Sequence, residues 1–223
     1  MTPPIPNWIK YKHIPGYTNI YSLQPNETRI FGTESLYGDW NGRVLLMAKD
    51  FACSKLIRDR IAEGDPRPFR HEPSLRTNTR LRKCADCIAT GARPEACGIL
   101  YGSVLAGMLR DDDSMSGTLP SRKLALDYGS RIVSFVRSSM PNLQVVACMG
   151  EDSWLAATKS FDITLCWKEA SRATTPTFAK NTYVIAVHHP ARASNEKMIR
   201  AWDLVSQTLS ASGTFPSKEQ RRA

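Results

Sequence analysis

The sequence predicts an α/β fold, a three-layer α/β/α sandwich with a central four-stranded parallel sheet. Four short apolar runs, typical of strands buried on both faces, alternate with segments that have helical spacing. Strands that alternate with helices pair in parallel, so helices should cover both faces of the sheet. The expected strands are 43–48, 97–101, 143–148 and 182–187; the expected helices are 51–62, 74–88, two that begin near Ser121 and Gly150, and 194–209.

The chain has 223 residues, which suits one compact domain, and its 42% hydrophobic and 23% charged residues are ordinary for a globular protein. We expect an arm packed on the domain over 1–40, the domain over 41–211 and a mobile basic tail over 212–223. No apolar run approaches the roughly 20 residues that cross a bilayer, and the N-terminus lacks a secretion signal. A cytoplasmic protein without a membrane partner is therefore expected; the sequence indicates no oligomeric state.

Positive charge is concentrated between Lys55 and Lys83. The whole chain has a formal net charge of +9, and this segment has nine Lys and Arg against four acids. Such a segment is either a solvated face or a contact surface for nucleic acid, and its position between two candidate site motifs favours the second. We expect Arg70, Arg76, Arg80 and Lys83 to contact DNA phosphates.

An acid and an imidazole stand where two expected strands end. Ligands of open parallel sheets bind beyond the carboxyl ends of the strands, which selects Asp50 after the first strand and His189 after the fourth. Together they form a plausible acid/base or electrostatic pair. Two alternatives remain open: Asp50 is the N-cap of the helix that follows, or His189 is a packing residue or metal ligand.

The motifs around these residues resemble those of the uracil-DNA glycosylase superfamily. Leu45-Leu-Met-Ala-Lys-Asp50-Phe51 is similar to the Gly-Gln-Asp-Pro-Tyr segment after the family's first strand, and His189-Pro190-Ala191-Arg192 resembles its second motif after the last strand. Pro68-Phe69 looks like the Pro-Phe pair whose ring stacks on the extruded base. Asn142-Leu-Gln-Val-Val-Ala-Cys-Met-Gly150 is similar to the third strand and its glycine. The resemblance covers about residues 40 to 210.

The resemblance implies a monofunctional hydrolase that cuts uracil or a related damaged base from DNA. Asp50 would stabilise the cationic sugar and orient water, and His189 would donate a hydrogen bond to the base. Base contacts are expected from the backbone of Ala48, Lys49 and Phe51, from stacking on Phe69 and from Ser103. An equal alternative makes Phe69 a loop anchor in the core.

Several positions depart from the family pattern. Lys49 stands where glutamine is usual, Phe51 where proline is usual, and Ser103 where many members have the asparagine that reads the base edge. Arg192, another expected DNA contact, lies where the family places a duplex-penetrating leucine, which suggests a preference for single strands. These departures keep open a DNA-binding relative without catalysis.

Cysteine spacing gives little support for a metal. Cys84 and Cys87 are followed by Cys97, but no fourth ligand comes at a standard distance, and a structural zinc site takes four. The pattern of the family's iron–sulfur members is missing, since no cysteine precedes Cys53. We therefore expect no zinc, iron–sulfur cluster or other cofactor. A metal-dependent hydrolase built on His188, His189 and the cysteines is a third, less favoured hypothesis.

Overall fold

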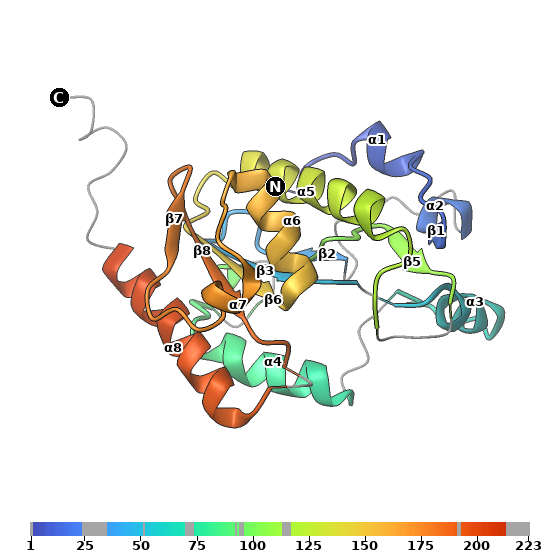
Figure 1. The fold of residues 1–223 in the computed structure, drawn as a ribbon. Coiled ribbons are helices and arrows are strands. Elements are labelled where there is room, and N and C mark those ends of the chain that lie inside the picture. Colours follow the sequence, from blue (N-terminus) through green and yellow to red (C-terminus); the bar gives the residue numbers. More distant parts are fainter. Residues whose placement is uncertain are drawn as a thin grey trace.

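A six-stranded mixed sheet forms the centre of the molecule (Figure 1). The computed structural model describes residues 2–23, 35–50, 52–69, 74–91, 93, 96–112, 117–190 and 193–212. β4, β3, β6 and β8 pair in parallel with one another. β2 pairs antiparallel with β4 at one edge of the sheet, and β7 pairs antiparallel with β8 at the other. The predicted α/β class is confirmed, but the sheet has six strands rather than four. In spatial order they are β2 (Leu36–Gly38), β4 (Ile99–Ser103), β3 (Val44–Ala48), β6 (Val145–Met149), β8 (Thr182–Val187) and β7 (Thr177–Ala179).

The two central strands, β3 and β6, are apolar along their whole length because both faces of the sheet are covered. Every residue of β6 is buried, as are the first four residues of β3. The prediction placed β4 two residues too early, so Gly102 and Ser103 lie inside this strand and not after it. β2 and β7 were not predicted, since three residues are too few to show a period.

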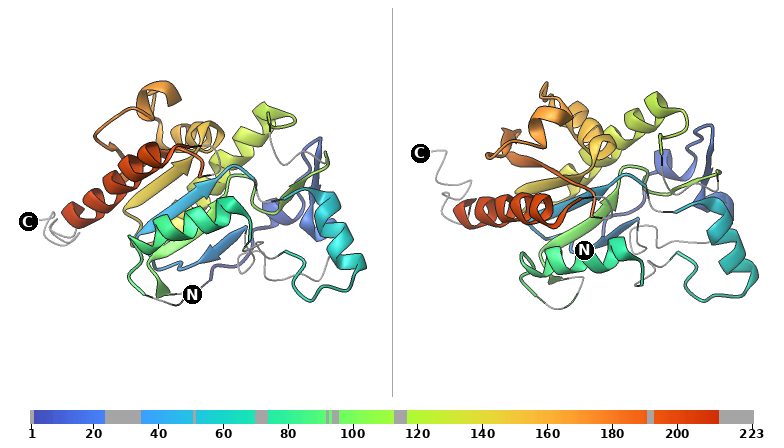
Figure 2. Two further views of the ribbon diagram at one scale, coloured as in Figure 1. Left: turned by 90° about the horizontal axis from the view of Figure 1, so that it is seen from below. Right: turned by 60° about the horizontal axis from the view of Figure 1, so that its bottom comes forward.

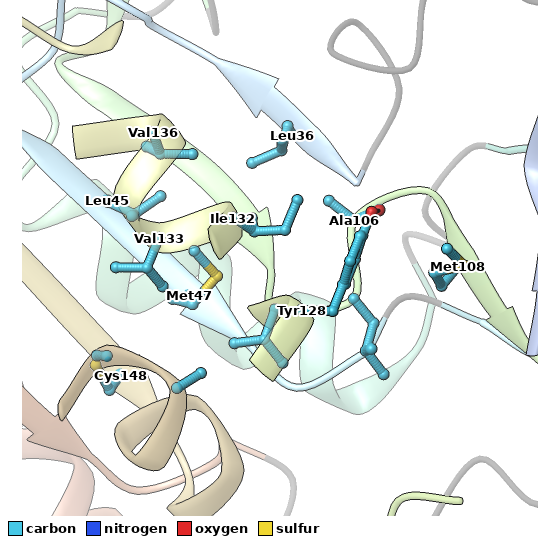
Figure 3. Packing of buried hydrophobic residues seen from close by; sticks show 14 of the residues in the cluster. Leu36, Leu45, Met47, Ala106, Met108, Tyr128, Ile132, Val133, Val136 and Cys148 are labelled. Atoms are coloured by element: carbon cyan, nitrogen blue, oxygen red, sulfur yellow. Dashed lines mark hydrogen bonds between the residues drawn. The ribbon is translucent and has the colours of Figure 1, made fainter. Parts of the chain in front are cut away.

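Successive strand residues point to opposite faces, and each face has its own core. Helices α5 (Arg122–Ser139) and α6 (Glu151–Phe161) cover one face, where Tyr128, Ile132 and Val133 lie against Leu45 and Met47 (Figure 3). Helices α4 (Arg76–Asp86) and α8 (Asn195–Ser212) cover the opposite face (Figure 2). Each inner strand is therefore covered by helices on both sides.

The N-terminal arm packs on the domain. The expected boundary at residue 40 is not where the central sheet begins, because β2 lies within 1–40 and is one of its strands. The other described elements of the arm are α1 (Asn7–Lys10), β1 (Tyr17–Asn19) and α2 (Ile20–Leu23), and β1 pairs antiparallel with β5 (Met108–Arg110) in a separate two-stranded sheet. The ring of Trp8 contacts Tyr128 of α5 edge-on, with 5.6 Å between ring centroids, and the Arg131 guanidinium lies 4.3 Å from the Trp8 centroid. The arm thus joins the core on the α5 side. The expected tail after residue 212 lies outside the described residues.

Ser121 precedes α5, as predicted, but it does not cap the helix with its side chain. Its backbone is left-handed, with φ 43° and ψ 44°, and no hydrogen bond runs from its hydroxyl to the first turn. A capping serine has an extended backbone, so this conformation explains the missing bond. Among the described residues, no helix combines the length and apolar character needed to cross a bilayer.

We predict that Tyr128→Phe lowers stability without changing the fold. The buried hydroxyl donates a hydrogen bond of 2.6 Å to the carbonyl oxygen of Ala106, and its loss leaves that carbonyl without this donor. The expected loss is about 1–3 kcal/mol, read as a lower Tm by calorimetry. Ser138→Ala, which removes an exposed hydroxyl from the same helix, should leave Tm nearly unchanged. Equal Tm values for Tyr128→Phe and the parent would contradict the prediction.

Candidate functional site

Asp50 and His189 leave the sheet at the same level and from the same edge. Met47 of β3 pairs with Cys148 of β6, and Cys148 pairs with Ala186 of β8, all in parallel. Asp50 follows Met47 by three positions, and His189 follows Ala186 by three positions. Neighbouring strands lie 4.7–4.9 Å apart, so β3 and β8 are separated by roughly 10 Å with the end of β6 between them.

Gly150 directly follows β6, between the two candidates, and leaves open space there. Its φ of 101° and ψ of 171° fall in a region that is essentially restricted to glycine. A Cβ atom built at Gly150 would have no heavy atom within 4 Å, outside its chain neighbours. α6 begins at the next residue and directs the positive end of its dipole to this edge. The middle strand therefore ends without a side chain between Asp50 and His189.

Asp50 has one buried and one accessible side. Its Oδ2 is inaccessible and lies 3.5 Å from Nη1 of Arg110 and 3.4 Å from Nζ of Lys49. Neither contact has hydrogen-bond geometry, so both are electrostatic. The side chain as a whole is 17% exposed, and this exposed part lies away from Oδ2. The N-cap alternative for Asp50 is wrong, since α3 (Ser54–Ala62) has Cys53 at its N-cap position.

Arg110 is the main site residue that the sequence analysis missed. Its guanidinium, 3% exposed, donates from Nε and Nη2 to the carboxylate of Asp112 at 2.9 and 2.7 Å, and from Nη2 to the carbonyl of Thr118 at 3.3 Å. The hydrogen bond to Asp112 raises the pKa of Arg110 and lowers the pKa of Asp112. This bidentate pair fixes the guanidinium, so that its remaining nitrogen, Nη1, faces Asp50.

Tyr17 places a buried hydroxyl near the same charges. It lies opposite Arg110 in the pairing of β1 with β5. Burial raises the pKa of Tyr17 well above its ordinary value; Arg110 opposes this shift and Asp50 adds to it. The Tyr17 hydroxyl, Oδ2 of Asp50 and Nη1 of Arg110 are all buried and have no hydrogen-bond partner among the described residues. Buried polar atoms of this kind are usually satisfied by ordered water or a ligand.

The structure gives Ser103 and Phe69 contacts within the protein. Ser103 is 2% exposed; its hydroxyl donates to the carbonyl of Lys49 at 3.2 Å and accepts from the amide of Leu105 at 3.1 Å. Phe69 is 4% exposed and belongs to the core on the α5 side, which is the loop-anchor alternative. Contact of either residue with a base would require these interactions to be exchanged.

Ala48 and Lys49 are tied to neighbouring backbone. The Ala48 carbonyl accepts a hydrogen bond of 3.0 Å from the amide of Val104, and Nζ of Lys49 donates to the carbonyl of Gly117 at 3.0 Å. These bonds fix the chain just before Asp50. Three further predicted residues, Phe51, Arg70 and Arg192, lie outside the described part of the chain.

The two histidines after β8 have different surroundings. The ring of His188 contacts Trp167, the first residue of α7 (Trp167–Ala170), edge-on with centroids 5.7 Å apart. Burial lowers the pKa of His188, and the nearby Lys197 adds to this effect. His189 is partly exposed, and its carbonyl accepts a hydrogen bond of 3.1 Å from the amide of Ala193. The His188 ring therefore packs on Trp167, and His189 is the partly exposed residue that follows it beyond the carboxyl end of β8.

The predicted phosphate contacts on α4 fall into two groups. Arg76 and Lys83 are exposed. Arg80 is partly buried, and its guanidinium donates to Pro190, Ala193 and Asn195. Arg76, Arg80 and Lys83 share one face of the helix because they are spaced four and three residues apart. Arg76 and Lys83 therefore present their charges to solvent, whereas the Arg80 guanidinium is engaged by protein acceptors.

All six cysteines are free thiols. Burial raises the pKa of Cys84, and the thiols of Cys87 and Cys97 donate to carbonyl oxygens of Lys83 and Ile99. Within the described residues, no group of three or more His, Cys, Asp or Glu side chains is arranged to hold a metal ion. The structure therefore adds no support for the metal-dependent hydrolase.

A separate surface pocket of about 580 Å³ lies along the outer side of α8. Thr174, Arg200 and Asp203 are among its lining residues, and neither Asp50 nor His189 is. It is therefore distinct from the open space at Gly150.

Comparison with known proteins assigns no family to the chain. A scan against protein-family models finds no match, and a search of curated proteins finds none either. The function is therefore inferred from the site residues themselves.

We predict that Arg110→Met destabilises the protein far more than Arg122→Met. Loss of the buried guanidinium leaves Oδ2 of Asp50 facing an apolar side chain and frees Asp112, at a cost of about 3 kcal/mol. Arg122 makes an ion pair of 2.9 Å with Asp152 but is 41% exposed, so its loss should cost less than about 1 kcal/mol. Urea unfolding measures both values, and similar losses for the two variants would contradict the prediction.

Proposed function

We propose that the protein is a DNA glycosylase of the uracil-DNA glycosylase type, which hydrolyses the N-glycosidic bond of uracil or a related damaged base. One observation carries the proposal: Asp50 and His189 follow level ends of parallel strands, with the open position at Gly150 between them. In this proposal β4, β3, β6 and β8 are the parallel sheet of that fold, and β2 and β7 are added at its edges.

In the proposed reaction the oxygen of a water molecule bonds to the sugar carbon C1′ as the bond to the base nitrogen breaks. The proton that this water gives up is balanced by the proton that the departing base anion takes up. The electron pair of that bond leaves with the base, so positive charge develops on the sugar and negative charge on the base. The accessible side of Asp50 would stabilise the sugar and orient the water, and His189 would donate a hydrogen bond to the base oxygen. The rate gain comes from charges already in place where new charge develops.

Binding of DNA is supported by charge near this edge. Arg76 and Lys83 are exposed on α4, the helix that also contacts the segment after His189. They could hold phosphates while the target base leaves the stack, at a cost of a few kcal/mol. The carbonyls of Ala48 and Lys49, like Ser103 and Phe69, are engaged within the protein, so a base contact by any of these groups would require its present interaction to be exchanged.

A second function, DNA binding without catalysis, is favoured by the surroundings of Asp50. Two cations, Arg110 and Lys49, lie within 3.5 Å of its Oδ2. They offset part of the negative charge that would stabilise a cationic sugar. The two functions share the DNA-binding surface and differ only in turnover.

We predict that the protein cuts uracil-containing single-stranded oligonucleotides after alkali treatment, and that Asp50→Asn and His189→Gln each lower the rate about a hundredfold or more. Two matched controls should retain the parental rate. Asp162→Asn removes an exposed carboxylate at a left-handed position that asparagine tolerates, and His188→Gln removes the packing histidine.

The same assay separates the competing functions. Salt-dependent binding without strand breaks, over a panel of uracil, hydroxymethyluracil, hypoxanthine and xanthine in single- and double-stranded DNA, would favour the non-catalytic function. Neither breaks nor binding would contradict both. Breaks that persist in Asp50→Asn would remove the proposed site while leaving an enzyme.

A further inference from the structure

Arg80 connects α4 to the segment that directly follows His189. Its Nη1 donates a hydrogen bond of 2.6 Å to the carbonyl of Pro190, and its Nη2 donates to the carbonyl of Ala193 at 3.1 Å and to Oδ1 of Asn195 at 2.9 Å. The acceptors lie more than a hundred positions away in the sequence, on both sides of residues 191–192. One side chain thus holds the exit of β8 and the start of α8.

We propose that Arg80 is a positioning residue for His189 and not a phosphate contact. This inference rests on the proposed function, because it assigns Arg80 a role in presenting the imidazole at the edge of the sheet. The Ala193 amide donates a hydrogen bond of 3.1 Å to the His189 carbonyl and so ties these two residues together. Arg80 adds hydrogen bonds to the carbonyls of Pro190, the next residue after His189, and of Ala193.

The hydrogen bonds of Arg80 to Pro190, Ala193 and Asn195 form a clamp, and helix α4, which supplies Arg80, is itself fixed. α4 and α8 lie on the same face of the sheet (Figure 2), and residues of both belong to one buried cluster, including Ala85, Met198 and Trp202. A planar guanidinium can donate in several fixed directions at once, whereas a lysine ammonium is a point charge on a flexible stem. The position therefore requires arginine for its geometry and not only for its charge.

Because of its hydrogen bonds, Arg80 should not contact phosphates as Arg76 and Lys83 are proposed to do. Arg76 and Lys83 lie on the same helix face and are exposed, so they can approach a phosphate without losing a contact. Arg80 would have to release three protein acceptors to do so. Because each phosphate contact contributes about one unit to the salt slope of binding, the two roles differ measurably.

The first test compares steady-state kinetics and salt dependence of uracil excision. Arg80→Ala and the charge-conserving Arg80→Lys should both lower kcat about ten- to hundredfold, with KM and the salt slope near parental values. Arg76→Ala and Lys83→Ala should raise KM and reduce the slope by about one unit each. Lys159→Ala, an equal loss of charge at an exposed position in the last turn of α6, should match the parent.

The second test needs no activity. In the DNA-free protein, Arg80→Ala and Arg80→Lys should speed amide hydrogen exchange at residues 188–195 about tenfold or more, above all at Ala193, while the rest of the sheet keeps its protection. Failure of the parent to excise uracil would overturn the proposed function and leave this test of the clamp intact. Unchanged exchange at 188–195, a rise spread over the whole chain, or a loss of salt slope with normal kcat would each overturn the positioning role.

Discussion

The parallel pairing of β6 with both β3 and β8 is the constraint on which the rest of the structure depends. It sets Met47, Cys148 and Ala186 at one level, and so it sets the level at which Asp50 and His189 leave the sheet. Because both faces of β6 are buried, its register is fixed by two cores at once, one under α5 and α6 and one under α4 and α8. A slip of one residue would exchange the faces of every side chain in the strand.

A group of polar contacts around Arg110 joins distant parts of the chain. Arg110 closes β5, pairs with Tyr17 of the arm across the small sheet, and faces Asp50 after β3. Its charge is tolerated in a buried position because Asp112 and the Thr118 carbonyl accept its hydrogen bonds. The arm therefore does more than cover α5, since it contributes to the environment of the candidate acid.

The sequence predicted those features that local patterns encode. Continuous apolar runs identified the four inner strands, and helical spacing identified the long helices. The edge strands β2 and β7 are too short for any period, and β4 begins later than its apolar run because Gly98 has a φ of 79° and breaks the strand before Ile99. Both candidates at the sheet edge followed from the rule for strand ends.

What the sequence did not reveal depends on partners far along the chain. Arg110 stands before a run of aspartates, and no local pattern indicates that one of them, Asp112, is its bidentate partner. Arg80 was expected to be one of several phosphate contacts, because nothing in α4 indicates acceptors near residue 190. Ser103 was expected to contact the base, and no local pattern indicates that its hydroxyl bonds to the Lys49 carbonyl and the Leu105 amide.

The two edge strands, β2 and β7, cover the sides of the sheet at which another chain could pair. An inner parallel strand exposed at an edge would present an apolar template to which another chain could add. Here each margin is a three-residue antiparallel ribbon, β2 on one side and β7 on the other, too short to recruit a partner by main-chain pairing. The four parallel strands β4, β3, β6 and β8 are thereby confined to the interior of the sheet.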